Sequence, residues 1–262
     1  LMTIIKKLAR STLGLFLCSV LSTFAFAESE TIHYLVIEGV EPLQVATEAD
    51  ALAGGLVTEV VQAVFAKSDY NLQPIVAPWL RLNKMRMSDQ FDHWLVYGNP
   101  KIGDMNESFS TLPIFPWRHT LVVKKGQLNF DRLEDLNDQT LVLVHGYDYQ
   151  GLDDHLVSKH PDSGTIKEFR AASVAAALRM LKNNRGSGYV DIDIRLMHHL
   201  KQLGFDQDEF EFYDFSDVIP AANIHLMFNN DLPTEIKHFI NQRLESLQQS
   251  GTLEKLLHKY LN

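Results

Sequence analysis

Cysteine is almost absent from this chain. Only Cys18 is found among the 262 residues, and it lies near the N-terminus. A framework of disulfides within the chain is therefore excluded, and the fold must rest on a hydrophobic core. A chain of this length can bury one core of ordinary size or two small ones.

Long apolar runs are also missing, except near the N-terminus. There, Lys6, Lys7 and Arg10 precede a mostly apolar, uncharged stretch over residues 13–26, which ends in the small-x-small pattern Ala25-Phe26-Ala27. A positive start, an apolar stretch and a small-residue cleavage pattern are typical of a secretory signal peptide. The stretch is shorter than the roughly 20 residues of a membrane-spanning helix, although an uncleaved N-terminal anchor is an alternative.

These features predict a signal peptide over residues 1–27 and a mature chain that begins near Glu28. Leu17, which precedes Cys18, is not the small residue that a lipoprotein site requires. We therefore expect a protein that is free in the periplasm and carries no lipid.

Positive charge is scarce relative to negative charge. The chain has 24 Lys and Arg residues against 33 Asp and Glu residues, for a net charge of −9. Removal of residues 1–27 would leave 21 basic residues and a net charge of −12. Nucleic acids and anionic membrane surfaces are therefore not expected as partners.

Recognisable motifs of catalysis and cofactor binding are missing as well. Gly186-Ser187-Gly188 lacks the Gly-x-Ser-x-Gly pattern of a nucleophile elbow, and Asp191 stands where the last glycine of a dinucleotide fingerprint would be. The 11 histidines include no His-Glu-x-x-His, and the adjacent His198 and His199 point apart on a helix. The acidic run over 206–211 is more typical of a solvated surface than of paired carboxylates. We expect no metal, no cofactor and no enzymatic activity.

The chain does contain an alternation of strand-type and helix-type patterns. Apolar runs predict strands, and apolar residues at i, i+3, i+4 and i+7 predict helices with one buried face. The predicted strands cover 32–37, 72–76, 93–97, 119–124, 141–144, 166–169, 189–192 and 224–228, and the helices cover 57–65, 81–87, 152–159, 174–181 and 236–247, with a last one after Gly251. Two successive α/β blocks are implied.

Seven short motifs occur along these blocks. They are Ala53-Gly54-Gly55-Leu56, Ala77-Pro78-Trp79-Leu80-Arg81, Phe109-Ser110-Thr111-Leu112-Pro113, and the segments 122–126, 133–136, 144–147 and 247–255. Their joint order, over nearly all of the mature chain, resembles that of periplasmic solute-binding proteins of the amino-acid-binding type (extracellular solute-binding protein family 3).

The resemblance implies a two-lobed α/β fold of the type II periplasmic-binding kind. Each lobe would be a mixed sheet flanked by helices, and two crossing strands would form the hinge. Lobe 1 would comprise 28–117 plus 224–262, and lobe 2 would comprise 118–223. A monomer is expected, which binds a small solute between the lobes and works with a membrane permease.

Loops at strand ends should face that cleft, and they supply the candidate ligand contacts. Helix N-termini there offer unpaired N–H groups to an anion, and aromatic faces hold apolar or cationic parts of a ligand. The candidates are Glu38, Trp79, Arg81, Tyr97, Asn99, Arg118, Tyr147, Tyr149, Ser173 and Asp193. Arg81 is the first choice for a ligand anion, because a planar guanidinium suits a carboxylate. Half-buried packing for the aromatic residues and a surface position for Arg81 are the alternatives.

One departure from the family pattern bears on the ligand. Members that bind α-amino acids carry a Thr-x-x-Arg after the third strand, whereas this chain reads Gly-Asn-Pro-Lys-Ile-Gly over 98–103. Lys101 and Arg118 are candidates to replace the missing arginine, but neither restores the motif, so an ordinary α-amino acid is a weaker expectation for the ligand. The family's acidic residue for the ligand ammonium falls near Asp193, and Asp191 points the same way if the strand continues. The alternative is that one of these aspartates caps the following helix.

Two other functions are open at this stage. A few dehydratases that act on prephenate-like acids resemble this fold and carry a carboxylate in the cleft. A periplasmic sensor subunit would use the same lobe surfaces to signal to a membrane partner. The pattern of residues does not separate transport from sensing.

Overall fold

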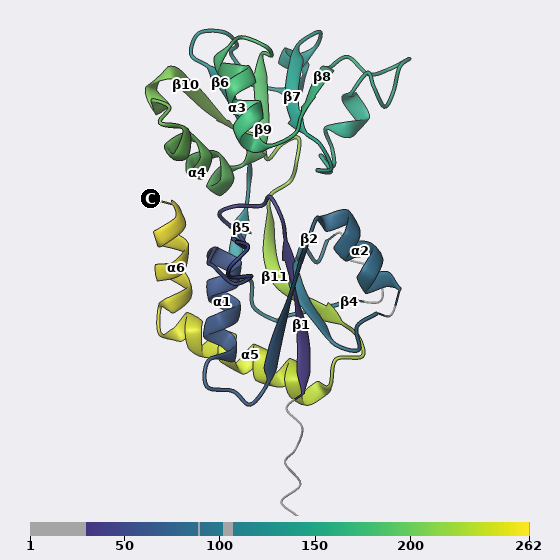
Figure 1. The fold of residues 1–262 in the computed structure, drawn as a ribbon. Coiled ribbons are helices and arrows are strands. Elements are labelled where there is room, and N and C mark those ends of the chain that lie inside the picture. The colour runs from purple at the N-terminus through teal and green to yellow at the C-terminus, as the bar shows by residue number, and fades with distance from the viewer. Residues whose placement is uncertain (1–29, 89, 102–106, 262) are drawn as a thin grey trace, which may run out of the picture. The chain divides into compact units, whose positions relative to one another are not determined.

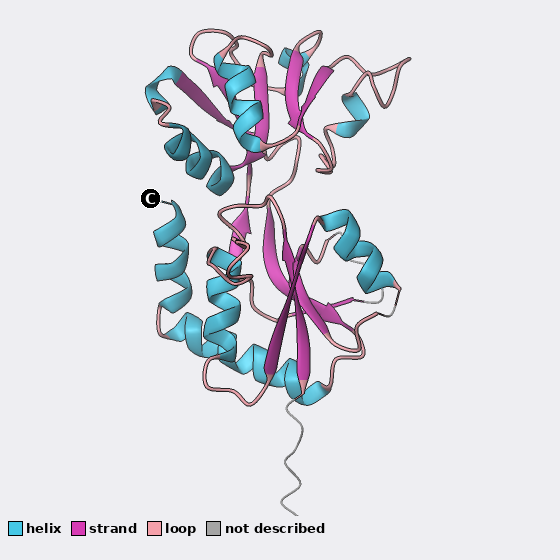
Figure 2. Ribbon diagram, viewed as in Figure 1, coloured by secondary structure: helices cyan, strands magenta, loops and turns pink. Residues whose placement is uncertain are grey.

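A computed structural model describes residues 30–88, 90–101 and 107–261. The predicted signal peptide lies outside the described residues. The chain has a mixed α/β fold with two sheets, which confirms the predicted fold class (Figures 1 and 2). In the described part of the chain, no helix has both the length and the apolar character needed to cross a membrane.

The first sheet brings together strands from both ends of the described chain. It contains β1 (Thr31–Ile37), β2 (Asn71–Ala77), β3 (Trp94–Gly98), β4 (Glu107–Phe109), β5 (Phe115–Trp117) and β11 (Ala222–Asn229). The strand order is β2-β1-β3-β11-β4, and β5 pairs with β11 outside this path. Because β1 runs parallel to β2 and β3, the carboxyl ends of these three strands lie at the same edge.

The second sheet is built from the middle of the chain. It contains β6 (His119–Lys124), β7 (Thr140–Val144), β8 (Lys167–Ala171), β9 (Gly188–Ile192) and β10 (Phe210–Asp214), in the order β10-β6-β9-β7-β8. Here β7 is parallel to β8 and β9, whereas β6 is antiparallel to β9. The carboxyl ends of β7, β8 and β9 therefore share an edge with the start of β6.

Six α-helices accompany the sheets in the described residues. They are α1 (Leu56–Phe65), α2 (Trp79–Met87), α3 (Val174–Lys182), α4 (Asp193–Leu203), α5 (Thr234–Gln249) and α6 (Thr252–Leu261). α1, α5 and α6 contact one another beside the first sheet, and α3 contacts α4 beside the second (Figure 1). Gly251, at φ 70°, separates α5 from α6, as the sequence predicts.

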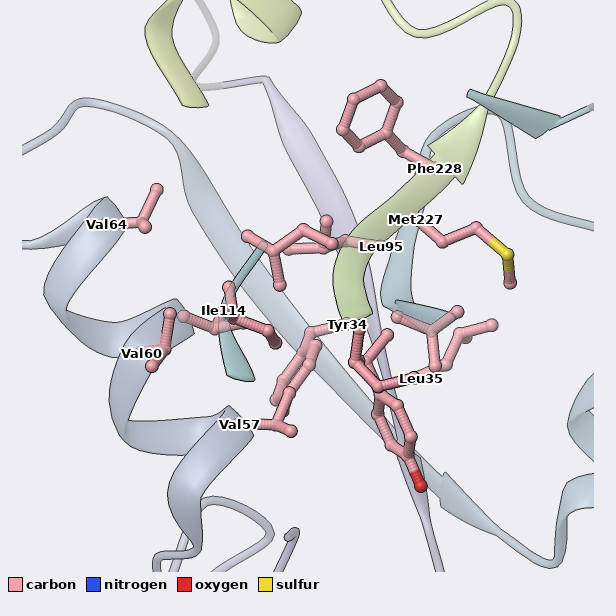
Figure 3. Packing of buried hydrophobic residues seen from close by; sticks show 14 of the residues in the cluster. Tyr34, Leu35, Val57, Val60, Val64, Leu95, Ile114, Met227 and Phe228 are labelled. Carbon is pink, nitrogen blue, oxygen red and sulfur yellow. The ribbon is translucent and has the colours of Figure 1, made fainter. Parts of the chain in front are cut away.

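The hydrophobic core follows the predicted periodicity. Val57, Val60 and Val64 lie on one side of α1 and point toward Tyr34 and Leu95 of the first sheet (Figure 3). The second sheet is apolar on both faces, because alternate residues of β6, β7 and β9 enter two separate clusters. β6, β7 and β9 are therefore mostly apolar, which makes them recognisable in the sequence, whereas β8 and β10 carry several charged residues.

The structure corrects three predictions about local elements. The helix predicted over 152–159 is wrong: only a short 3-10 turn, Asp153–His155, forms there, and Leu156 makes a bridge to Ile166. The acidic run over 206–211, in which Asp206 and Asp208 are exposed as expected of a solvated surface, also contains regular structure that was not predicted, a 3-10 turn over Gln207–Glu209 and the start of β10. Asp191 and Asp193 do not point the same way, because the strand ends at Ile192 and α4 begins at Asp193.

The lobe boundaries stay a proposal, since residues 31–262 form one compact unit. The division agrees with strand membership: β1 to β5 and β11 form one sheet, and β6 to β10 form the other. The chain passes between the sheets at Arg118 and again over 215–221.

Candidate functional site

The carboxyl edge of the second sheet collects four of the predicted site residues. Tyr147 follows β7, Ser173 follows β8 and caps α3 by accepting the N–H of Ala176 at 3.2 Å, and Asp193 opens α4 after β9. Arg118 precedes β6 and lies at the same edge, since His119 pairs with Ile192 and the Asp193 N–H donates to the Arg118 carbonyl. This edge is where open α/β sheets bind ligands.

The carboxyl edge of the first sheet collects most of the others. Glu38 follows β1 and is exposed, Trp79 and Arg81 lie at the start of α2 after β2, and Tyr97 and Asn99 lie at the end of β3. Arg81 is exposed on α2. The Trp79 ring makes a cation–π contact with Arg86, whose guanidinium lies 5.6 Å from the ring centroid, so part of the ring is not available to a ligand.

A single residue joins these two edges. Arg118 is all that separates β5 of the first sheet from β6 of the second, and β5 pairs with the start of β11 next to the end of β3. A pocket of about 420 Å³ opens at this junction. It is lined by Asn99, Pro100, Lys101, Pro116, Arg118, Ala221, Ala222, Asn223 and His225. The pocket therefore brings together two predicted site residues, Asn99 and Arg118, that are distant in the sequence.

Arg118 and Asp193 form an ion pair beside the pocket. The Arg118 Nη2 lies 3.5 Å from the Asp193 Oδ2, and the side chains are 58% and 24% exposed. Burial raises the pKa of Asp193, although the Ile194 N–H and Arg118 act in the opposite direction. At this separation and exposure the pair is loosely held, so each partner can exchange the other for a ligand group.

A row of aromatic side chains continues inward from the junction. Ring centroids of Tyr97 and Trp117 are 6.3 Å apart, those of Trp117 and His119 are 6.3 Å apart, and those of His119 and Tyr147 are 5.9 Å apart. The His119 Nε2 and the Tyr147 hydroxyl are hydrogen-bonded at 2.7 Å. We call Tyr97, Trp117, His119 and Tyr147 the junction row, because it runs from β3 of the first sheet to the loop after β7 of the second.

Tyr149 and Tyr97 differ from the other aromatic candidates in their burial. Tyr149 is fully buried, and its hydroxyl accepts the Val144 N–H at 2.9 Å. Tyr97 is 9% exposed. Tyr147 is only partly buried, and it is therefore the candidate on the β7 loop with a ring face near solvent.

A buried ion pair lies beneath Tyr147, and the sequence analysis did not identify it. Arg195, 4% exposed, places Nη1 3.3 Å from the Asp191 Oδ1, and its guanidinium lies 5.9 Å from the Tyr147 ring centroid. Asp191 also accepts hydrogen bonds from the Tyr189 hydroxyl and from the Ile192 N–H. Helical spacing does not predict this pair, because Asp191 lies on β9 and Arg195 lies in the first turn of α4, so the turn from strand to helix brings the two charges together.

The described residues contain no group of three or more His, Cys, Asp or Glu side chains that could hold a metal ion. The chemistry that the site offers is recognition: one guanidinium, one carboxylate, one ammonium on Lys101, amides and aromatic faces.

His119 makes the stability of this region depend on pH. Burial lowers the pKa of His119 to about 4, from the usual histidine value of 6.5. Because the unfolded chain holds the proton more tightly, the contribution of neutral His119 is complete above pH 6.5 and declines as the pH falls toward 4. We expect a loss of about 2 kcal/mol through this residue between pH 7 and pH 5. Urea unfolding of the wild type and of His119→Gln at both pH values measures it, and an equal pH dependence of the two proteins would contradict the expectation.

Comparisons with known proteins bear on the fold and on the resemblance. No family model matches the chain. A curated relative, the probable amino-acid-binding protein YxeM of Bacillus subtilis (strain 168), is 26% identical over 144 residues, which are 54% of this chain. The match spans 51% of the relative's own length.

Solved structures cover far more of the chain. A structure from work on glutathione import via GshT and the cystine ABC importer TcyBC of Streptococcus mutans has a TM-score of 0.72 and 21% identity, over 89% of this chain and 95% of that one. The periplasmic VFT2 domain of the sensor BvgS from Bordetella pertussis has a TM-score of 0.63 and 17% identity, over 88% and 93%. An ancestral amino-acid-binding protein, described as a precursor of cyclohexadienyl dehydratase, has a TM-score of 0.66 and 16% identity, over 88% and 96%.

These comparisons confirm the resemblance that the motifs predict. The proteins similar to this chain include amino-acid-binding proteins and substrate-binding proteins of ABC transporters. The chain has the two-lobed fold of periplasmic binding proteins.

Proposed function

We propose that this protein is a periplasmic solute-binding protein that captures a small amino-acid-like or anionic solute and delivers it to an ABC-type importer. The observation that carries the proposal is the Arg118–Asp193 pair at the edge of the junction pocket. A zwitterionic solute offers a carboxylate to Arg118 and an ammonium to Asp193, so each charge of the pair exchanges one partner for another.

This arrangement accounts for the missing family arginine. The segment 98–103 contains no arginine, but the link between the two sheets places Arg118 next to Asn99 in the same pocket. A guanidinium binds a carboxylate through two parallel N–H donors, which the single ammonium of a lysine does not provide. Arg118 is therefore our candidate for the carboxylate contact, and Arg81 stays a second candidate on the opposite edge.

The remaining candidates have supporting parts in the proposed site. Asn99, Ser173 and Tyr147 would contribute polar and aromatic contacts around the pair, whereas Glu38 and Trp79 would bound the site from the first sheet. Tyr149 would act from the core by holding the β7 loop through Val144. We also propose that the protein is exported, acts as a monomer, and has no enzymatic activity toward its solute.

Replacement of either charge should weaken binding strongly. A thermal-shift screen of the twenty L-amino acids and common organic acids on residues 28–262 supplies the ligand, and titration calorimetry supplies the affinity. We expect Arg118→Ala and Asp193→Asn each to lose at least about 2 kcal/mol of binding free energy, on the order of 30-fold in Kd. Loss of a charge-assisted hydrogen bond in a closed site is the cause.

Arg132→Ala is a matched control for these variants. Arg132 makes an exposed ion pair with Glu134 at 3.9 Å, in the segment between β6 and β7. We expect its affinity to equal that of the wild type. Unchanged affinity in both Arg118→Ala and Asp193→Asn would refute the proposed site, and recovery of a chemically altered solute would favour the dehydratase reading.

The sensor alternative leads to the same solute but a different partner. Crosslinking of the ligand-bound protein in membranes distinguishes the two, because an importer would be captured in one case and a signalling receptor in the other.

A further inference from the structure

The junction pocket has an unbalanced charge. Two of its nine lining residues, Lys101 and Arg118, carry a positive charge, and none of the nine is acidic. Its histidine, His225, is hydrogen-bonded through Nδ1 to the Ser110 carbonyl at 2.7 Å. An anion that enters this pocket therefore meets attraction from two sides and no carboxylate on the lining.

Lys101 lines the pocket and is hydrogen-bonded there to neutral groups. Its Nζ donates to the Ala221 carbonyl at 3.3 Å, and its backbone N–H donates to the Asn99 Oδ1 at 3.0 Å. No carboxylate among the described residues pairs with it. A neutral carbonyl leaves two of the three ammonium donors available, so Lys101 can accept a further anionic group.

The charges of the site can now be matched to those of a solute. In the proposed function, Asp193 takes an ammonium and Arg118 takes a carboxylate, which leaves the charge of Lys101 unmatched. On the first-sheet edge, exposed Glu38 and Arg81 have opposite signs and add no net charge. A solute with a second carboxylate completes the balance. The volume of about 420 Å³ lies in the usual range for small-molecule sites.

We propose, on the basis of the proposed function, that the solute is a dicarboxylic amino acid or a closely similar anion, with one ammonium and two carboxylates. Lys101 is the residue that selects the second carboxylate. If the solute carried an uncharged amide in place of the second carboxylate, the Lys101 ammonium would have no counter-charge. The site should therefore bind the acid more tightly than its amide.

Isosteric ligand pairs test the inference. L-glutamate is compared with L-glutamine, and L-aspartate with L-asparagine, by titration calorimetry at pH 7 and two salt concentrations. We expect the acid of at least one pair to bind ten-fold or more tightly than its amide. In Lys101→Gln this ratio should fall to about three-fold or less, whereas Lys101→Arg should keep it. Lys125→Gln, which removes an exposed lysine outside the pocket, is the matched control and should also keep it.

The outcomes separate this inference from the proposed function. Three results would overturn the inference and leave the proposed function standing. They are equal or tighter binding of the amides, an unchanged acid-to-amide ratio in Lys101→Gln, and binding of neutral amino acids only. Binding of neither an amino acid nor an organic acid would overturn both.

Discussion

Arg195→Met is expected to lower the free energy of unfolding by about 3 to 5 kcal/mol, because it leaves the Asp191 carboxylate buried without its cation. Both side chains of this pair are at most 5% exposed, so water does not replace the lost partner. The guanidinium also covers the Tyr147 ring, and that contact is lost with it. At 2 to 4 °C per kcal/mol for a chain of this size, Tm should fall by roughly 10 °C.

Two further variants test the cause of this loss. Lys259→Met breaks an exposed ion pair with Glu59, in which the lysine is 58% exposed, and should cost less than about 1 kcal/mol. Adding Asp191→Leu to Arg195→Met removes the isolated carboxylate and should restore part of the stability. If Arg195→Met were as stable as Lys259→Met, the loss of its cation would not leave Asp191 as an uncompensated buried charge.

Gly55→Ala should be nearly as damaging, by a steric route. Gly55 precedes α1 at φ 101°, and an added Cβ would lie 2.6 Å from the Leu43 carbonyl oxygen and 2.7 Å from the Gln44 Cα. Neither backbone atom can move freely, because the buried Gln44 side chain accepts the Ile37 N–H and donates to the Leu35 carbonyl. We expect a loss of about 3 kcal/mol or more in urea unfolding.

Gly54→Ala isolates the backbone part of that effect. Gly54 also has a positive φ, of 153°, but nothing lies within 4 Å of its Cβ position. Its loss should be limited to the conformational cost of about 1 kcal/mol. If Gly55→Ala does not fold at all, circular dichroism will show the loss of secondary structure. That result would also agree with the expectation, as a larger loss of stability. Equal stability of the two variants would show that the loop at Leu43 adapts.

The elements that were predicted correctly are those whose burial follows a strict period. Every third or fourth residue of α1 is buried against the first sheet, and β6 and β7 are continuous apolar runs between two clusters. The false helix over 152–159 has apolar residues at the same spacing, Leu152 and Leu156. Their burial arises from turns and from the bridge to Ile166, a partner that local spacing does not reveal. β10 was missed because acidic side chains interrupt its apolar pattern.

The site was harder to predict for a different reason. Loops that follow parallel strands are assigned to one edge by the chain order, and this predicts Asn99 as a ligand contact. Arg118 is predicted for a different reason, as a substitute for the missing family arginine. Arg195 was not chosen, because arginine is seldom buried and its partner Asp191 was expected on the same side as Asp193. Asp191 and Asp193 face different directions because β9 ends at Ile192 and α4 begins at Asp193. Local spacing in the sequence does not reveal this boundary.

The junction row has an optical consequence. Trp117 lies between Tyr97, on a strand of one sheet, and His119, on a strand of the other, so bending at Arg118 must change its surroundings. An indole emits at a wavelength that depends on its exposure to water, and protonated imidazole quenches it. Because the pKa of His119 is about 4, the imidazole stays neutral near pH 7 and does not quench Trp117. If the sheets move relative to each other when a solute binds, the Trp117 part of the emission should change, over a background from Trp79 and Trp94, and no attached dye is needed.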